Sequence, residues 1–390
     1  MKEIKVRSHR TPIYRDSAFF LEDPSATRNA FEEELDHPRS PENYIYSRYR
    51  NPTVVSVEEQ LMEIEGCQWA LLTQSGMAAI DVALSIFQRN GETGSWLFFS
   101  EIYGGTNSYI DRILKYRRGI DIKRFYPSND RYDLEALEKI FIEEKPQLVF
   151  FEAISNPMLI VADGDRIIEM ARKHNVITII DNTFATPYLW KPLKKGADIV
   201  IHSATKYLSG HNNITAGVVC GNNGEYLKEA IEYRKWIGHM LSPDDAYRLG
   251  TQLKTFELRF ERHCRNAERL AKALASHPKI EKVFFPSLST HPTYAEALSL
   301  FKGRGNGAMI TFDIYGKTPD EKGENAVKFI RAVSTDIPIL PSLGDTQTII
   351  LHVESVWGQK YPLPGMIRLS TGIEDYEKLE NTILTSLEAI

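Results

Sequence analysis

The sequence predicts an α/β protein with a large domain built on a mostly parallel sheet and a smaller C-terminal α+β domain. Three observations lead to this fold class. The chain has 390 residues, of which 42% are hydrophobic and 25% charged, so it can bury a large core. Between about residues 57 and 260, short apolar runs alternate with runs of helical period, which is typical of parallel strands covered by helices on both faces. After residue 275 the pattern changes to alternating strands with flanking helices.

Residues 1–58 are predicted to form an irregular N-terminal arm. Prolines recur throughout it, which disfavours regular helix and sheet, and an aromatic and basic cluster follows at 44–50. A long arm of this kind is expensive to order alone. We therefore expect it to pack on a neighbouring subunit.

Residues 59–252 are predicted to form the large domain. Its strands are expected at 96–99, 148–152, 176–181, 199–202 and 217–220. Helices are expected at 134–144 and 165–173. Ligands bind outside the carboxyl ends of the strands in such sheets, so the residues that follow these strands are candidates for a site.

Residues 253–390 are predicted to form the smaller domain. A long amphipathic helix over 252–275 would connect it to the first domain. Strands are expected at 282–285, 308–313 and 366–370, and helices at 324–333 and 376–390.

Composition excludes several classes of protein. The net charge of −5, without a basic patch, gives no footprint for nucleic acid. Three cysteines without a paired motif argue against a disulfide framework, and His202 and His211 lack metal-ligand spacing, so no metal is expected. The N-terminal residues have no apolar signal core and no stretch is long enough to cross a bilayer, so we expect a cytoplasmic protein.

Lys206 is the strongest candidate for chemistry. The apolar run 199–202 ends in small hydroxyl residues around this single amine, and Asp181 ends the preceding apolar run. Taken separately, Lys206 could extend to the surface and Asp181 could cap a helix. Together, an amine and a carboxylate at the ends of successive buried strands are what a pyridoxal phosphate (PLP) site requires. The amine binds the cofactor aldehyde, and the carboxylate keeps the pyridine nitrogen protonated.

A third feature is the run 73–79, in which small residues open a helix. The backbone N–H groups around Gly76 and Met77 would form a site for a phosphate, with an ordinary helix start as the alternative. Ser203 and Thr205 would donate hydroxyl hydrogen bonds to the same phosphate. Burial would disfavour the charged form of the amine beside them and make it a better nucleophile.

Three further residues are candidates for contact with the cofactor or the substrate. Tyr103 follows a predicted strand and could stack on a planar ring, or pack on the sheet edge as a turn residue. Arg368 interrupts an apolar strand, and its guanidinium suits a substrate carboxylate or a structural ion pair. Asn156 precedes a proline and could reach the cofactor or the substrate, or simply form a turn.

Motifs spread in order over nearly the whole chain resemble those of a known family. They lie at 46–53, 74–77, 103–105, 181–187, 203–211, 342–344 and 368–375. The chain is similar in these motifs to the trans-sulfuration (Cys/Met metabolism) PLP-dependent enzymes, which include cystathionine γ-synthase, cystathionine γ- and β-lyases, methionine γ-lyase and O-acylhomoserine sulfhydrylases.

The resemblance implies an aspartate-aminotransferase-like fold (fold type I) and a homotetramer built of two tight dimers. It implies that Lys206 carries PLP covalently, that Asp181 pairs with the ring nitrogen, and that Tyr103 stacks on the ring and assists proton transfer. The cofactor phosphate would be bound by Gly76, Met77, Ser203 and Thr205, together with Tyr46 and Arg48 reaching across from a neighbouring subunit. The amino-acid substrate would be oriented by Asn156, Ser342 and Arg368.

The implied activity is γ-replacement like that of cystathionine γ-synthase, in which an O-acylhomoserine and cysteine give cystathionine. The alternatives are a γ-lyase that releases 2-oxobutanoate and ammonia, and a non-catalytic homologue. Gly105 stands where methionine γ-lyases tend to carry a reactive cysteine. Pro341 precedes Ser342, and in having proline there the chain resembles plant-type synthases. Arg50 replaces the usual glycine, where it would alter the entrance or pair with an anionic substrate. The segment 352–364, which normally lines the substrate channel, is shorter than usual.

Overall fold

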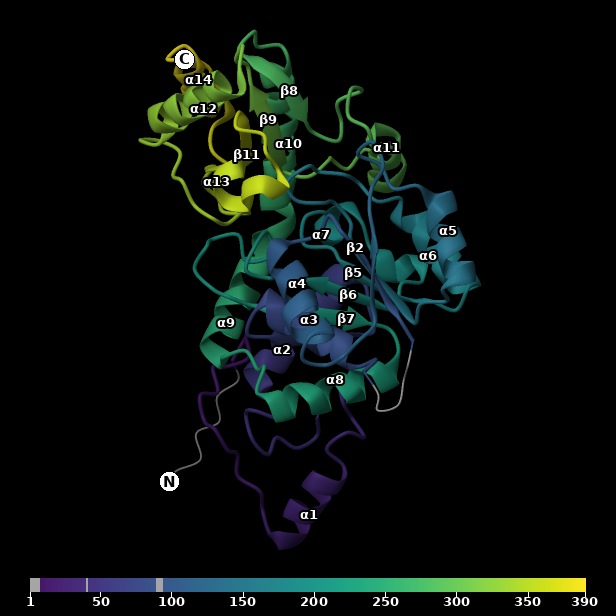
Figure 1. Ribbon diagram of the computed structural model, residues 1–390. Coiled ribbons are helices and arrows are strands. Elements are labelled where there is room, and N and C mark those ends of the chain that lie inside the picture. The colour runs from purple at the N-terminus through teal and green to yellow at the C-terminus, as the bar shows by residue number, and fades with distance from the viewer. Residues whose placement is uncertain (1–7, 40, 89–93) are drawn as a thin grey trace.

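Two sheets organise the chain in the computed structural model, which describes residues 8–39, 41–88 and 94–390 (Figure 1). Within these residues, the larger sheet has seven strands in the order β1-β7-β6-β5-β4-β2-β3. They are β1 (Trp69–Thr73), β2 (Trp96–Phe99), β3 (Ile122–Phe125), β4 (Leu148–Glu152), β5 (Ile177–Asp181), β6 (Ile199–His202) and β7 (Gly217–Gly221). Residues 1–7 and 40 of the predicted arm lie outside the described part.

The larger sheet is mostly parallel, as predicted. Strands β3, β2, β4, β5 and β6 run parallel, and only β7 pairs antiparallel with its neighbours β6 and β1. Every residue of β1, β2, β4, β6 and β7 is buried, which fits their mostly apolar sequences. We did not predict β1 or β3. In β3 two of the four residues are charged, because this strand forms an edge of the sheet and only one neighbour covers it.

Helices cover the larger sheet. In chain order they are α2 (Pro52–Glu65), α3 (Gly76–Ser85), α4 (Gly104–Tyr109), a π-helix (Ile110–Lys115), α5 (Leu134–Glu143), α6 (Gly164–Lys173), α7 (Thr186–Leu189), a 3-10 turn (Pro192–Lys195), α8 (Gly224–Ile237) and α9 (Pro243–Gln252). Helix α3 packs on β6 and β7, and α6 packs on β5. In Figure 1, α5 and α6 lie together on the side of the molecule away from α9.

The prediction of an irregular arm up to residue 58 is wrong at two places. Helix α1 (Pro24–Glu32) lies within the arm, and α2 begins at Pro52. Both helices have proline at the first helical position, where its missing N–H is not needed and its fixed φ favours the helix. Asp23 and Asn51 cap them, because each side chain accepts hydrogen bonds from backbone N–H groups of the first turn.

The C-terminal part contains the second sheet. It is antiparallel, with the order β10-β11-β9-β8, and its strands are β8 (Ile280–Phe284), β9 (Met309–Ile314), β10 (Ile349–His352) and β11 (Met366–Ser370). Its helices are α10 (Phe256–Ala275), α11 (Tyr294–Phe301), α12 (Pro319–Val333), α13 (Val353–Trp357) and α14 (Tyr376–Leu387), with a 3-10 turn (Gly358–Lys360) after α13. Helix α10 packs on β8, β9 and α14.

The predicted connecting helix over 252–275 begins later than expected, at residue 256. Helix α9 ends at Gln252, a 3-10 turn spans Leu253–Thr255, and α10 begins at Phe256. The division between the domains at residue 252 stays a prediction. In the described ranges, no helix is both long and apolar enough to span a membrane.

Candidate active site

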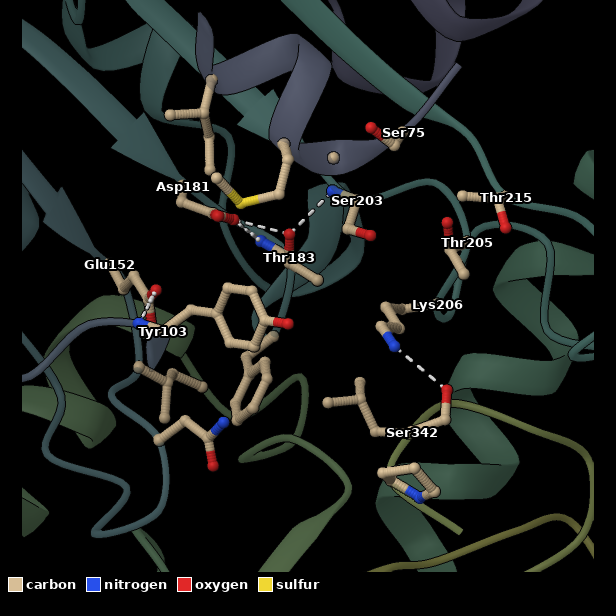
Figure 2. Close-up of a pocket in the computed structure, with 18 of the residues that line it drawn as sticks. Ser75, Tyr103, Glu152, Asp181, Thr183, Ser203, Thr205, Lys206, Thr215 and Ser342 are labelled. Carbon is tan, nitrogen blue, oxygen red and sulfur yellow. Dashed lines mark hydrogen bonds between the residues drawn. The ribbon is translucent and has the colours of Figure 1, made fainter. Parts of the chain in front are cut away.

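A cavity of about 250 Å³ lies at the carboxyl ends of β4, β5 and β6, where the sequence places the candidate residues (Figure 2). Residues of the C-terminal part, at 341–343 and 368, close it from the other side. Ten of the predicted site residues line this one cavity: Gly76, Met77, Tyr103, Asn156, Asp181, Ser203, Thr205, Lys206, Ser342 and Arg368. The fold therefore brings together groups as far apart in the chain as Gly76 and Arg368.

Tyr46 and Arg48 are absent from the described lining of this cavity. They lie on the arm, where Arg48 Nη1 donates to the backbone oxygen of Lys235 at 2.6 Å. The Arg48 guanidinium also lies over the rings of Tyr46 and Tyr49, at 5.6 and 5.1 Å from the centroids. Tyr46 and Arg48 are thus held by contacts within the chain, but neither lines the described cavity of that chain.

Lys206 points its amine into the cavity (Figure 2) and donates to Ser342 Oγ at 3.0 Å. Burial and the positive charge of Arg368 lower the pKa of the amine to about 8. The approach of the 342–344 loop depends on Gly344, which has φ of +80° and whose Cβ, if present, would lie 2.7 Å from the backbone nitrogen of Tyr207. A glycine is therefore needed to bring Ser342 to the lysine.

Asp181 is held by Thr183, which the sequence reasoning missed. The backbone N–H and Oγ1 of Thr183 both donate to Asp181 Oδ1, at 3.0 and 2.5 Å. Thr183 Oγ1 also accepts from the backbone N–H of Ser203 at 2.8 Å, so it links the ends of β5 and β6. Burial raises the pKa of Asp181, while the two hydrogen bonds from Thr183 oppose this shift.

Glu152 is a second residue that the sequence reasoning missed. It pairs in register with Asp181 on the neighbouring parallel strand and lines the same cavity. Its Oε1 accepts from the backbone N–H of Tyr103 at 2.6 Å. Burial and the nearby Asp181 carboxylate raise its pKa well above the usual range, so Glu152 favours its neutral form. The sequence signal that could have identified Glu152 is its place as the single acidic residue at the end of the apolar run 148–152.

The start of α3 forms one end of the cavity. Ser75 Oγ accepts from the Ala78 N–H at 3.0 Å, and the N–H groups of Gly76 and Met77 precede the hydrogen-bonded part of the helix. A Cβ at Gly76 would lie 2.8 Å from Ser203 Cβ, so glycine lets the helix start approach the loop after β6. Figure 2 shows the side chains of Ser75, Ser203 and Thr205 at this end. This arrangement suits an anion.

Thr205 differs from the other groups at this end. Its Oγ1 accepts from the Ala216 N–H at 2.9 Å and donates to the Ala216 oxygen at 3.1 Å. A hydrogen bond from Thr205 to an anion would therefore have to replace its bond to Ala216.

Arg368 is buried in β11 and reaches across the cavity. Its Nη1 donates to Asn156 Oδ1 at 3.1 Å and its Nη2 to the Ser342 oxygen at 3.0 Å. Its Nε has no partner among the described residues. Burial lowers its pKa to about 10, which leaves it charged at neutral pH. A buried guanidinium with donors to spare suits a carboxylate ligand.

Arg50 does not line the cavity of its own chain. Arg50 is buried at the base of the arm, where Nη2 pairs with Glu58 at 2.8 Å and Nη1 donates to the Pro38 oxygen. Glu58 also pairs with Arg234 at 3.2 Å. Arg50 thus fastens the arm to α2 through Glu58, which also pairs with Arg234 on α8.

Comparison with known proteins decides the family. Residues 1–388 match the model of the Cys/Met metabolism PLP-dependent enzymes. The chain belongs to this family. It is 35% identical to the L-methionine γ-lyase of Fusobacterium nucleatum subsp. polymorphum, over 97% of this chain and 93% of that protein. It is 36% identical to the cystathionine β-lyase of Lactococcus lactis subsp. cremoris, over 89% of each chain.

Solved structures agree with this assignment. The chain matches the cystathionine γ-synthase of Xanthomonas oryzae pv. oryzae with a TM-score of 0.84 and 28% identity, over 97% of this chain and 93% of that one. It matches the cystathionine γ-lyase of Lactobacillus plantarum with a TM-score of 0.83 and 29% identity, over 97% and 93%. The protein is therefore a trans-sulfuration enzyme of fold type I that depends on PLP.

The cavity fits this cofactor. An amine of lowered pKa, a carboxyl group fixed by two hydrogen bonds and an anion site at a helix start face one space. These are the groups that an aldehyde, a pyridine nitrogen and a phosphate need. When bound, PLP supplies an electron sink for negative charge that develops at the substrate α-carbon.

Proposed function

We propose that Lys206 binds PLP covalently and that Asp181 pairs with its ring nitrogen. Tyr103 stacks on the ring, and the phosphate is bound by Gly76, Met77, Ser203 and Thr205. The substrate is oriented by Asn156, Ser342 and Arg368. The support is geometric, since all of these residues line one cavity and the amine and the carboxyl group come from successive strand ends. The chain would then divide into an N-terminal arm over residues 1–58, a large PLP-binding domain over 59–252 and a smaller C-terminal domain over 253–390.

We further propose γ-replacement of the cystathionine γ-synthase kind, in which an O-acylhomoserine and cysteine give cystathionine. The observation that favours it is the contact between Gly105 and Tyr103. A Cβ at position 105 would lie 2.4 Å from Cε1 of the Tyr103 ring. A cysteine at position 105, where methionine γ-lyases tend to carry a reactive one, would require the half-exposed Tyr103 ring to move, and the glycine leaves this position without a thiol.

The chain's own groups support this chemistry. Arg368 and Asn156 hold the substrate carboxylate, which fixes the α-carbon near Lys206. With a pKa near 8, Lys206 exchanges a proton readily at neutral pH and serves as the acid and base at the α- and β-carbons. Ser342 Oγ, which accepts from Lys206 Nζ, keeps the amine aimed into the cavity.

The second candidate is γ-elimination, which releases 2-oxobutanoate and ammonia from cystathionine, methionine or homocysteine. The similarity to curated methionine γ-lyases over 97% of the chain favours it. A non-catalytic homologue is a third possibility, which the presence of Lys206, Asp181, Tyr103 and Arg368 in one cavity opposes.

One set of incubations separates these candidates. The enzyme is given L-methionine, L-cystathionine, or O-acetyl- or O-succinylhomoserine with and without cysteine, and 2-oxobutanoate and cystathionine are assayed. The proposal predicts cystathionine from an ester and cysteine. Oxobutanoate from methionine alone would favour the lyase, and no turnover of any substrate would favour the non-catalytic homologue.

We also propose that the enzyme is a homo-oligomer, a dimer of dimers, in which Tyr46 and Arg48 complete the phosphate site of a neighbouring subunit. The support is their position on the arm, outside the cavity of their own chain.

A further inference from the structure

A hydrogen bond joins the two domains beside the cavity. Glu101 lies two residues before Tyr103 in the loop after β2, and Tyr361 lies in the shortened segment between α13 and β11. Tyr361 Oη donates to Glu101 Oε2, and Lys360 Nζ lies 3.5 Å from Glu101 Oε1. The Tyr361 residue is 8% exposed and the Glu101 side chain 13%. Such a bond between a phenol and a mostly buried carboxylate is stronger than one at the surface.

Tyr361 is anchored firmly in the C-terminal domain. It belongs to a small core with Phe284, Val353 and Met366, against which Met158, Trp357 and Leu363 pack. The hydroxyl is therefore presented from a fixed position. On the other side of the bond, Glu101 belongs to the loop that carries Tyr103, whose backbone is itself fixed by Glu152.

The same segment contacts the substrate side of the cavity. The ring of Trp357 lies 5.3 Å from the guanidinium carbon of Arg368. Residues 353–364 thus touch Arg368 through Trp357 and the Tyr103 loop through Tyr361. Tyr103 and Arg368 both line the cavity, so this segment contacts one cavity residue directly and the loop that carries the other.

We propose that Glu101 and Tyr361 are positioning residues that latch the two domains and set the spacing between Tyr103 and Arg368. The shortened segment would then determine how tightly the site closes on an amino acid. This inference rests on the proposed roles of Tyr103 and Arg368. A substrate must touch both, whereas the cofactor is held mainly by the large domain. Opening the latch should therefore weaken amino-acid binding and leave cofactor attachment unchanged.

The test is a titration with L-alanine, which has an α-amino and an α-carboxylate group but no leaving group. Binding is followed by the absorbance change of the bound cofactor in the holoenzyme. We expect Tyr361→Phe and Glu101→Ala each to raise the dissociation constant about tenfold, the effect of one lost hydrogen bond to a charged group. The double variant should equal the single ones, because both changes break the same bond.

Two controls make the result specific. Glu101→Gln keeps an acceptor for the Tyr361 hydroxyl and should stay within about threefold of the wild type. Tyr376→Phe removes a similar bond, from Tyr376 Oη to Glu380 at 2.7 Å on α14, and should have no effect. Cofactor content should be equal in all variants.

The outcomes separate the latch from the function beneath it. The latch would be overturned, and the proposed function left standing, if Tyr361→Phe bound L-alanine as tightly as the wild type. The same would follow if the dissociation constant of the double variant rose by the product of the two single increases. A wild-type enzyme whose absorbance does not respond to L-alanine would overturn the assignment of Arg368, and the latch with it.

Discussion

In the cavity, burial favours the neutral form of an amine and of a carboxyl group alike. It lowers the pKa of Lys206 to about 8 and raises that of Glu152 well above its usual range. Desolvation raises the pKa of Asp181 as well, but two hydrogen bonds from Thr183 stabilise its charged form. Of the two neighbouring carboxyl groups, Asp181 is therefore the one suited to face a protonated ring nitrogen.

Thr183→Val should weaken the cofactor site while keeping its shape. The substitution removes the hydroxyl that donates to Asp181 and accepts from the Ser203 N–H. We expect the dissociation constant of PLP to rise about tenfold, which corresponds to roughly 1–2 kcal/mol. Equilibrium dialysis of the apoenzyme measures it. Thr183→Ser keeps the hydroxyl and serves as the control, and equal affinity in Val and Ser variants would contradict the role of Thr183.

The pKa of Lys206 predicts how cofactor attachment depends on pH. Only the neutral amine attacks an aldehyde, so the rate should rise with pH and level off above a midpoint near 8. At pH 7.5 about a quarter of the amines would be neutral, against about one in a thousand for an exposed lysine. Stopped-flow absorbance after mixing apoenzyme with PLP measures the rate. A rate still rising steeply at pH 10 would contradict the lowered pKa.

Sequence reasoning found the residues whose chemical type was out of place. Lys206 and Asp181 stood out because each is a single charged group at the end of an apolar run. Thr183 and Glu152 did not, because their roles depend on strand register and on a hydrogen bond across 49 residues of sequence to Tyr103. A threonine in a loop is common, and nothing local distinguishes Thr183. Glu152 ends an apolar run just as Asp181 does, but its partner Tyr103 lies on a different strand's loop.

At the scale of elements, the arm is fixed by buried ion pairs. Glu58 on α2 pairs with Arg50 from the arm and Arg234 from α8, and its Oε1 also accepts from the Leu72 N–H on β1. The density of prolines led to the wrong prediction for this region. A proline disrupts a helix only when it lies in the helix interior, and not when it lies at the first position. Pro24 and Pro52 lie at first positions instead, behind the capping residues Asp23 and Asn51.

Glu58→Ala should destabilise the protein strongly, because it leaves two buried guanidinium groups without their carboxylate. We expect a loss of about 3–5 kcal/mol in the free energy of unfolding, measured by urea titration of the apoenzyme. Glu324→Ala, which removes an exposed i,i+4 pair with Lys328, should change it by less than about 0.5 kcal/mol. Similar losses in the two variants would show that the buried cluster does not hold the arm.

At the scale of the whole molecule, two sheets that the sequence pattern separated meet at one cavity. The alternation of short apolar runs with helices predicted the parallel sheet, because that pattern reflects burial on both faces. The prediction of the antiparallel sheet was less complete. It lacked β10, because this strand follows a loop without a clear hydrophobic period. The partners of Tyr46 and Arg48 cannot follow from local pattern either, because they would come from another copy of the chain.

Mixed oligomers test the proposed sharing of the site. Coexpressed Lys206→Ala and Arg48→Ala subunits would form mixed dimers with one intact site, which combines Lys206 of one chain with Arg48 of the other. Random pairing should restore about a quarter of the wild-type activity, although each variant alone is nearly inactive. Affinity tags on the two subunits measure the mixed fraction. Mixed dimers without activity would contradict a shared site.

Covalent attachment of the cofactor is the most direct test of the central claim. The purified holoenzyme is reduced with borohydride and digested, and the peptides are sequenced by mass spectrometry. The account predicts one phosphopyridoxyl group, carried by the peptide that contains Lys206. The label on any other lysine, or no label on an enzyme that contains PLP, would contradict it.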